Sequence, residues 1–299
     1  MPLFSVIIPV FNRADILRSA IDSIHNQEDR DFELICVDDG STDASVDVVR
    51  SYGDRVRLIE QTNAGPSVAR NRGVAAARGE YIAFLDSDDR FFPWTLATYR
   101  SVIESNHRPA IITGSPVVFT DKPPDVRKAD VQINRYKDYL DSGSAWRWFG
   151  VSSFVIRRDV YQSVGGFDAR WRGSEDSDLM LRIGTAAGFI QVVSPHTFAY
   201  LEHPTSLKSE LSRALAGNWN LIENEQAGRY PGGPDRAKER RRIITRHVRP
   251  FTLHCLAHGR TEDASRMYRA TRAWHLAEGR FKYLLGFPIK RLLSRGKHI

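Results

Sequence analysis

The sequence predicts an α/β fold in which an open, mostly parallel sheet is flanked by helices and followed by a helical C-terminal extension. Three observations lead to this prediction. Short, β-branched apolar runs alternate with amphipathic helical stretches over the first third of the chain. Strands that are separated by helices pair in parallel through right-handed crossovers. From Ser206 onward the pattern is helical throughout.

The first part of the chain alternates strands with helices. The expected strands are Phe4–Val10, Phe32–Val37, Val56–Glu60, Glu80–Leu85 and Ala110–Thr113. The expected helices are Asn12–Gln27, Asp43–Tyr52, Ser67–Ala77 and Pro93 to about Ser105. Ser41 or Thr42 is the expected N-cap of the second helix, and Pro93 is expected at the first position of the fourth.

The second part of the sheet is less regular in sequence. Residues 121–150 have weak periodicity and are expected to be partly loop. Later strands are expected at Ser152–Ile156, Gly188–Val193 and Thr197–Glu202, with a helix at Asp176–Ala187 that Ser174 can cap. We place the boundary between the α/β domain (1–205) and the helical extension (206–299) near Ser206. Within the extension, Pro231–Pro234 is a break and Gly259 joins two further helices.

Composition limits the class of protein. Of the 299 residues, 41% are hydrophobic, which is enough for a sizeable core. No apolar run is long enough for a transmembrane helix, no signal peptide is recognisable, and two cysteines cannot make a disulfide framework, so the cytosol is expected. The net charge of +7 suits nucleic acid, an anionic membrane or a phosphorylated substrate. Basic residues gather in 236–249 and 290–297.

Aspartates follow the second and fourth strands. Asp38 and Asp39 end the second strand, and Asp86, Asp88 and Asp89 end the fourth. Because the carboxyl ends of parallel strands meet at one edge of the sheet, these carboxylates should gather there and repel one another unless a cation neutralises them. Oxygen ligands without a nearby cysteine favour Mg²⁺ or Mn²⁺, which would hold a diphosphate. Asp86 and Asp88 would point the same way if the strand continued.

Two further polar segments are candidates for the site. Arg70, in the first turn of its helix, could face a donor molecule, whereas Gly65 and Ser67 are explained by a turn and an N-cap. Glu175, Asp176 and Asp178 begin the later helix, and three acids in four residues exceed what capping needs. One of them could act as a general base on an attacking hydroxyl.

Taken together, these segments resemble the family 2 glycosyltransferases, which have the GT-A fold. The matching segments, in family order, are FSVIIPVFNR, FELICVDDGSTD, NAGPSVARNRGVAAARGEYIAFLDSDD, GGFD and GSEDSDLMLR. They cover residues 3 to about 203. The resemblance divides the catalytic domain into a nucleotide-sugar-binding half (1–113) and an acceptor-binding half (114–205).

The resemblance also implies roles for individual residues. The nucleotide-sugar-binding residues would be Pro9, Val10, Phe11, Asn12, Asp38, Asp39, Asn63, Arg70, Asp86 and Ser87. Asp88 would be the main ligand of Mn²⁺ or Mg²⁺, with Asp86 and His203 near the metal. Asp176, beside Glu175, would be the catalytic base of an inverting, single-displacement reaction, and Trp171 and Arg172 would lie towards the acceptor.

The expected partners are a nucleotide-sugar donor, with UDP-sugars favoured, and a saccharide or lipid-linked acceptor of surface polysaccharide synthesis. The basic C-terminal helices could contact the inner face of a membrane, contribute to a homodimer or pack as ordinary helices; Pro288 is expected to interrupt the last of them. A sugar-nucleotide nucleotidyltransferase and a non-catalytic GT-A binding domain are the alternatives. The nucleotidyltransferase would need a glycine-rich loop after the first strand, but residues 11–15, which follow that strand, contain no glycine. A nucleic-acid partner is not expected.

Overall fold

The computed structural model describes residues 1–299 except 123–124, 144–149, 172, 203–210 and 296–299. The chain divides into two compact units. The first comprises Met1–Tyr139, Trp146–Ala169 and Ala186–Ser206, and the second comprises Leu140–Ala145, Arg170–Thr185 and Leu207–Ile299. This division differs from the boundary expected near Ser206, because 140–145 and 170–185 belong with the C-terminal helices.

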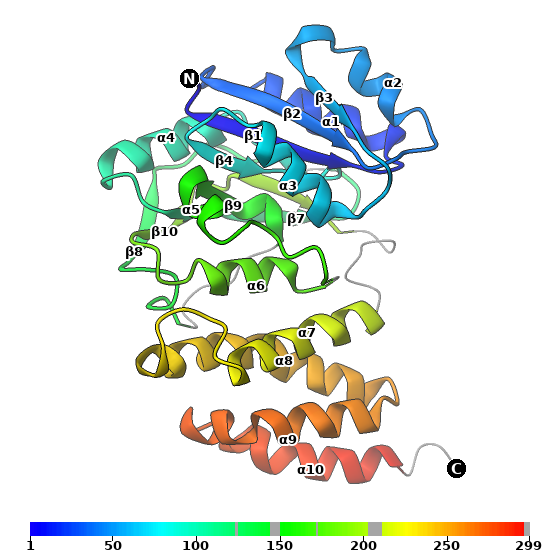
Figure 1. The fold of residues 1–299 in the computed structure, drawn as a ribbon, viewed down its shortest axis with the longest axis vertical. Coiled ribbons are helices and arrows are strands. Elements are labelled where there is room, and N and C mark those ends of the chain that lie inside the picture. The colour runs from blue at the N-terminus through cyan, green and yellow to red at the C-terminus, as the bar shows by residue number, and fades with distance from the viewer. Residues whose placement is uncertain (123–124, 144–149, 172, 203–210, 296–299) are drawn as a thin grey trace. The chain divides into compact units, whose positions relative to one another are not determined.

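Within the described residues, the first unit contains an eight-stranded sheet (Figure 1). Its strands, in spatial order, are β3 (Arg57–Glu60), β2 (Phe32–Asp38), β1 (Phe4–Val10), β4 (Tyr81–Phe84), β9 (Phe154–Arg157), β6 (Ile111–Thr113), β10 (Phe189–Ser194) and β8 (Gln132–Tyr136). Strands β3, β2, β1 and β4 are parallel, as are β6 and β10. The predicted mostly parallel sheet is therefore confirmed. The antiparallel strands β9, between β4 and β6, and β8, at the edge, were not predicted as such.

Helices cover both faces of this sheet. They are α1 (Ala14–His25), α2 (Ser45–Arg50), α3 (Pro66–Ala76), α4 (Thr95–Ser105) and α5 (Arg158–Ser163). Alternate residues of β1, such as Val6 and Ile8, share one buried core with Leu17 of α1 and Tyr99 of α4. Ile7 points to the other face, where a Cβ at Gly73 of α3 would lie 2.5 Å from its Cγ2 atom. The close approach of α3 to the sheet therefore requires glycine at that point.

A second, three-stranded sheet occurs in the described part of the first unit. It consists of β5 (Arg90–Phe91), β11 (Phe198–Leu201) and β7 (Pro116–Phe119), with β11 in the middle. β11 is antiparallel to β5 and parallel to β7. Of these strands only β11 was predicted, because β5 has two residues and both β5 and β7 are stabilised by pairing with β11, far along the chain. The first strand of this small sheet, β5, begins directly after the acidic segment that follows β4.

The predicted start of the second helix is wrong in detail. α2 begins at Ser45, and neither Ser41 nor Thr42 caps it. Instead, a carboxylate oxygen of Asp43 accepts the N–H of Ser45 at 2.9 Å, and the other oxygen accepts the N–H of Ala14 at 3.1 Å. The two polar loops that follow β1 and β2 are thus joined.

Two other helix starts also differ from the prediction. α3 begins at Pro66, directly after Gly65, whose φ of 94° few other residues adopt, so Ser67 is inside the helix rather than its cap. α4 begins at Thr95, two residues after Pro93, so Pro93 is not its first residue.

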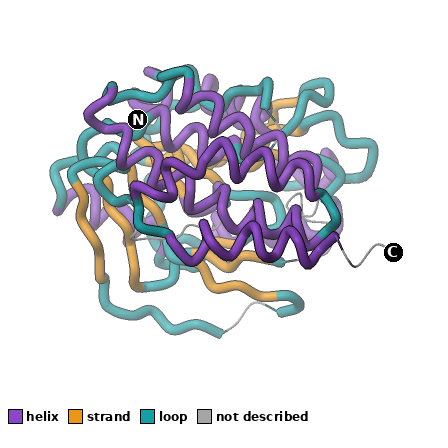
Figure 2. The backbone as a smooth tube through the Cα atoms, turned by 90° about the horizontal axis from the view of Figure 1, so that it is seen from below, coloured by secondary structure: helices purple, strands orange, loops and turns teal. Residues whose placement is uncertain are grey.

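The second unit is helical. Its helices are α6 (Glu175–Arg182), α7 (Leu211–Gln226), α8 (Ala237–Ala257), α9 (Thr261–Ala277) and α10 (Phe281–Arg295). Each packs on the next in chain order (Figure 1). In the view from below, helices are the purple segments of the tube (Figure 2). The breaks predicted at Pro231–Pro234 and at Gly259 are confirmed. None of the described helices is both long and apolar enough to cross a membrane.

Pro288 lies inside α10, so the prediction that it interrupts this helix is wrong. A proline has no N–H to donate to the carbonyl four residues earlier, which here belongs to Leu284. The hydroxyl of Tyr268, on α9, donates to that carbonyl at 2.9 Å. Packing against α9 therefore satisfies the acceptor that Pro288 leaves unused.

Candidate functional site

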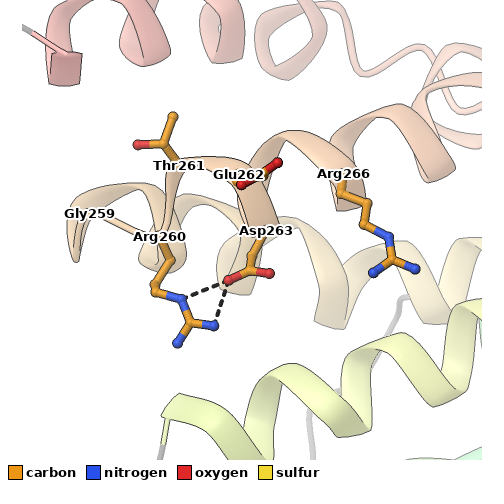
Figure 3. Close-up of a pocket in the computed structure, with 6 residues that line it drawn as sticks. All are labelled: Gly259, Arg260, Thr261, Glu262, Asp263 and Arg266. Atoms are coloured by element: carbon orange, nitrogen blue, oxygen red, sulfur yellow. Dashed lines mark hydrogen bonds and ion pairs between the residues drawn. The ribbon is translucent and has the colours of Figure 1, made fainter.

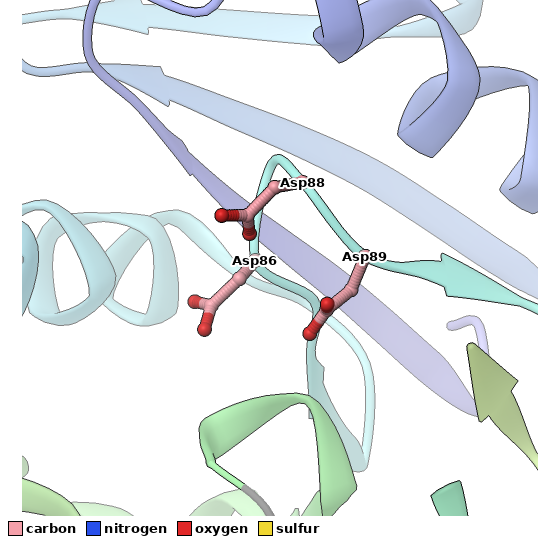
Figure 4. Close-up of side chains that lie close together, drawn as sticks. All are labelled: Asp86, Asp88 and Asp89. Carbon is pink, nitrogen blue, oxygen red and sulfur yellow. The ribbon is translucent and has the colours of Figure 1, made fainter. Parts of the chain in front are cut away.

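The segment that follows β4 gathers three aspartates. β4 ends at Phe84, and the N–H of Asp89 donates to the carbonyl of Asp86 at 3.0 Å, which closes a turn. Carboxylate oxygens of Asp86, Asp88 and Asp89 lie within 4.8 Å of one another (Figure 4). The side chains converge because of this turn, which we call the acidic turn, and not because β4 continues through them.

Asp89 is the buried member of the acidic turn, with 1% of its surface exposed. One carboxylate oxygen accepts the Ser152 hydroxyl at 2.5 Å, and the other accepts the N–H of Leu201 in β11 at 3.1 Å. Burial, reinforced by the negative charges of Asp86 and Asp88, raises the pKa of Asp89 well above its usual value. Asp89 therefore braces the turn, while the half-buried Asp86 and Asp88 are the candidates to bind a cation.

Arg70 neutralises part of this negative charge. Its side chain is 5% exposed, and its Nη2 atom lies 2.6 Å from an oxygen of Asp86. The guanidinium carbon also lies 5.4 Å from the ring centroid of Phe167, a distance typical of a cation–π contact. Ser87, between the two half-buried aspartates, is itself buried. The sequence analysis expected Arg70 at the site, and the structure places it on Asp86.

The loop after β2 is held by its own two aspartates. Asp39 accepts hydrogen bonds from Nε2 of Gln61 at 2.7 Å and from the N–H groups of Ala64 and Gly65 at 2.7 and 2.8 Å. It thus fixes the loop before α3, on which Asn63 is exposed. Asp39 was predicted to contact a nucleotide; most of its acceptor capacity is used within the chain.

Asp38 differs from Asp39 in one respect. Its Oδ2 atom accepts the N–H groups of Gly40 and Ser41 at 3.1 and 3.0 Å. Its Oδ1 atom is buried and has no hydrogen-bond partner among the described residues. An unpartnered buried carboxylate oxygen is costly, so this atom is a ready acceptor for a hydroxyl or N–H group of a ligand.

The predicted residues at the end of β1 divide between core and surface. Pro9 and Val10 are buried, whereas Phe11 is 44% exposed. Asn12, in the left-handed region with φ of 51°, accepts the N–H of Thr42 at 2.8 Å on its side-chain oxygen. Phe11 is therefore the side chain of this segment that can lie against a ligand, while Asn12 fastens the loops together.

Asn71, next to Arg70 on α3, organises a segment from much later in the chain. Its side-chain oxygen accepts the Tyr161 hydroxyl at 2.5 Å and the N–H of Phe167 at 2.9 Å. Its amide donates to the carbonyl of Phe167 at 2.8 Å. Gly166 has φ of 71°, and a Cβ there would lie 2.5 Å from the Asn71 oxygen. α3 thus holds both the acidic turn and the Gly-Gly-Phe-Asp segment.

In the second unit, the acids at the start of α6 have distinct environments. Asp178 is buried, is paired with Arg182 at 2.7 Å, and accepts Nδ2 of Asn224 at 3.1 Å and the Tyr230 hydroxyl at 3.0 Å. Asp178 therefore fastens α6 to the C-terminal helices.

The other two acids of α6 lie at its first residues. Glu175 accepts the N–H of Gly173 at 2.8 Å, and Asp176 accepts the N–H of Ser177 at 2.7 Å and is half-buried. Ser174 has φ of 55° and its side chain makes no cap hydrogen bond, contrary to prediction.

Trp171 is half-buried, while Arg172 and His203 fall outside the described residues. The expectation that Asp176 is the catalytic base stays a prediction, because Asp176 belongs to the second unit and the acidic turn to the first.

Two hollows in the described structure are lined by residues other than those of the acidic turn. One, of about 360 Å³, is lined by Gly259–Asp263 and Arg266 around the start of α9, where Arg260 pairs with Asp263 at 2.7 Å (Figure 3). The other, of about 450 Å³, is lined by opposite charges from the first unit, such as Arg78 and Glu80. Neither gathers the residues that the sequence predicted.

The chain is similar to known proteins both in sequence and in fold. A sequence model described as "Glycosyl transferase family 2" matches residues 5–165. The uncharacterised glycosyltransferase EpsJ of Bacillus subtilis is 30% identical over 238 residues, which are 76% of this chain and 69% of EpsJ. The uncharacterised glycosyltransferase YibD of Escherichia coli is 47% identical over 92 residues, which are 30% of this chain and 27% of YibD.

Solved structures share the fold. Staphylococcus aureus TarS 1–349 in complex with UDP aligns with a TM-score of 0.67 at 17% identity, covering 99% of this chain and 92% of TarS 1–349. The mannosyltransferase PcManGT from Pyrobaculum calidifontis, in complex with GDP-Man and Mn²⁺, aligns with a TM-score of 0.56 at 18% identity, covering 97% of this chain and 87% of PcManGT. At these identities the likeness concerns the fold.

Proposed function

We propose, from the premise that this chain belongs to glycosyl transferase family 2, that it is an inverting, metal-dependent enzyme that moves a sugar from a nucleoside-diphosphate donor to an acceptor hydroxyl. The observation that carries the proposal is the position of the aspartates around the end of β1. In the parallel registers, Asp38 pairs with Val10 and Phe84 pairs with Ile7. Asp38 and the acidic turn therefore lie on opposite sides of β1, and the intervening strand spacing separates them by roughly 10 Å.

That separation suits the two ends of a nucleoside diphosphate. The unpartnered Oδ1 of Asp38 is an acceptor for the nucleoside, and the exposed ring of Phe11 can lie against its base. Asp86 and Asp88 then lie towards the diphosphate, with Arg70 holding Asp86 in place. Asn12, Asp39 and Asn63 belong to the loops that frame this surface. Pro9, Val10 and Ser87 are buried beneath it and contribute backbone and packing.

The carboxylates fit a divalent cation. Asp86 and Asp88 offer hard oxygen ligands close together, as Mn²⁺ and Mg²⁺ require. Their negative charges add to the effect of burial in raising the pKa of Asp89, and a cation would offset them. When bound, such an ion would supply a positive charge to stabilise the diphosphate leaving group. His203 would approach the ion or the diphosphate, as the family resemblance implies.

On the acceptor side, Asp176 would receive the proton of the attacking hydroxyl, which displaces the diphosphate in one step. Asp178 is committed to Arg182, Asn224 and Tyr230, which leaves Asp176 and Glu175 as the acids of α6 suited to proton transfer. Trp171 and Arg172 would lie towards the acceptor.

A UDP-sugar is the favoured donor, in line with the UDP complex of TarS, and a saccharide or lipid-linked acceptor of surface polysaccharide synthesis is the favoured acceptor. We place the enzyme in the cytoplasm, on the inner face of the membrane. Family membership favours glycosyl transfer over the nucleotidyltransferase alternative, and the gathered carboxylates favour catalysis over a purely binding role.

The proposed function is tested by nucleotide release from a panel of UDP-, GDP- and dTDP-sugars with and without Mn²⁺. We expect release from one donor class, accelerated by an acceptor saccharide and lost when the ion is removed by a chelator. Equal release with and without the ion would overturn the metal-dependent mechanism. Pyrophosphate formation from a sugar phosphate and a nucleoside triphosphate would identify the nucleotidyltransferase instead.

A further inference from the structure

α10 has two apolar faces, and one of them packs within the second unit. Tyr283 and Phe287 are 7% and 2% exposed, and the ring of Phe287 stacks on that of Tyr268 with centroids 4.4 Å apart. Through these contacts α10 is fixed on α9. Most of the other apolar residues of α10 do not take part in this packing.

The other face carries a continuous apolar stripe that is exposed. Its members are Phe281 (59% exposed), Leu285 (71%), Ile289 (59%), Leu292 (70%) and Leu293 (68%). The spacings of four, four and three residues keep them on one side of an α-helix, opposite to Tyr283 and Phe287. Scattered exposed leucines need no explanation, but a contiguous stripe of this length marks an interaction surface.

The charge around the stripe selects its partner. Lys282 and Lys290 are exposed on α10, and the sequence from Gly279 to Ile299 contains no acidic residue. It does contain further basic residues, namely Arg280, Arg291, Arg295 and Lys297. A second copy of this chain would bring like charges together across the stripe. A partner that is apolar within and negatively charged at its surface complements both features.

We propose that α10 docks peripherally on an anionic lipid bilayer, with the stripe at the boundary of the headgroups and acyl chains and the lysines at the lipid phosphates. The helix spans Phe281–Arg295, shorter than the roughly 20 residues needed to cross a bilayer, and no described helix is suited to crossing. An amphipathic helix with basic residues beside an apolar face lies in the interfacial plane instead. This docking is independent of the proposed catalytic reaction.

The docking is tested by co-sedimentation of the full chain with vesicles. The probes are vesicles of phosphatidylcholine alone and vesicles that also contain about 30% phosphatidylglycerol. We expect binding to the anionic vesicles that weakens as salt is added, and little binding to phosphatidylcholine. No binding to the anionic vesicles, or equal binding to both, would overturn the proposal.

Variants locate the docking on α10. Leu285→Gln with Ile289→Gln should lower vesicle affinity by at least about tenfold, because both side chains would otherwise be buried in lipid. Val193→Gln, which changes an exposed apolar residue of β10 in the first unit, is the matched control and should bind as the parent does. Both proteins should keep their nucleoside-diphosphate affinity, which separates this result from the proposed function.

The contribution of the α10 lysines is measured against a second pair of lysines, which controls for the change in net charge. Lys282→Gln with Lys290→Gln should lower affinity for anionic vesicles by roughly tenfold. Lys122→Gln with Lys128→Gln removes the same net charge from the first unit and should have little effect. Equal losses in the two pairs would show that overall charge alone attracts the protein. A dimer that becomes monomeric on Leu285→Gln with Ile289→Gln, without any vesicle binding by the parent, would assign the stripe to a second copy.

Discussion

Asp38, Asp86 and Asp88 could be predicted to gather at one edge of the sheet because each lies at the end of a strand or within a few residues of it. Their supporting residues could not be predicted in this way. Ser152 contacts Asp89 across 63 positions of the chain, and Asn71 contacts Phe167 across 96. No local pattern reports such pairings, so the sequence indicated that Asp89 lies with the other aspartates but not that it braces the acidic turn through Ser152 and Leu201.

The ion pair between Arg70 and Asp86 should contribute to stability as well as to the site. Arg70→Met removes the cation from a partner that is 29% exposed and leaves the Asp86 carboxylate uncompensated. We expect the free energy of unfolding in urea to fall by about 3 kcal/mol, with part of the loss recovered when Asp86→Asn is added. A loss below about 0.5 kcal/mol, typical of surface changes, would show that the pair is not needed for folding.

At the scale of elements, strands and helices with a marked apolar pattern were predicted to within a few residues, as β1, β2 and α1 show. The misses share a physical cause. β5, β7 and β8 are short or lie at sheet edges, where pairing with distant segments rather than sequence pattern decides the structure. Helix starts were misplaced where a backbone turn such as Gly65, rather than a hydroxyl cap, begins the helix.

At the start of α6, the proposed catalytic base Asp176 and the structural residue Asp178 can be distinguished by substitution. Asp176→Asn should lower sugar transfer by at least about a hundredfold while leaving the unfolding free energy unchanged. Asp178→Asn should instead destabilise the fold by about 2 kcal/mol, because it weakens contacts to Arg182, Asn224 and Tyr230. Nucleotide release and urea unfolding of both variants measure the difference. Near-normal turnover of Asp176→Asn would refute its assignment as the base.

His275, near the junction of α9 and α10, should make the stability of the protein depend on pH. His275 is fully buried beside Tyr283, and both ring nitrogens lack hydrogen-bond partners among the described residues. Burial, with the positive charges of Arg280 and Arg249, lowers the pKa of His275 to about 4. The unfolded chain, with a pKa near 6.5, therefore binds the proton more tightly. The part of the unfolding free energy that depends on neutral His275 is fully present above pH 6.5 and is lost as the pH falls towards 4.

We expect this group to account for up to about 3 kcal/mol of the loss across that interval. Urea unfolding at several pH values, for the parent and for His275→Leu, isolates the effect. The variant should lose less stability than the parent between pH 6.5 and 4. Parallel pH profiles would mean that His275 titrates normally in the folded chain.

At the scale of the molecule, the α/β class and the helical extension could be predicted, whereas the antiparallel β9 and the composition of the two units could not. The insertion of β9 between β4 and β6 depends on which strand reaches the open edge of β4, and short apolar runs do not specify this. Similarly, α6 was assigned to the α/β domain by chain order, while Asp178 and its partners join it to α7 and the turn before α8.

We propose that a divalent cation and a nucleoside diphosphate bind together at the acidic turn. Calorimetric titration of the parent, Asp88→Asn and the exposed control Asp54→Asn with UDP, each with and without Mn²⁺, tests it most directly. We predict that Mn²⁺ tightens UDP binding to the parent and the control by at least about tenfold and leaves Asp88→Asn nearly unaffected. The same gain in Asp88→Asn, or no gain in the parent, would contradict the account.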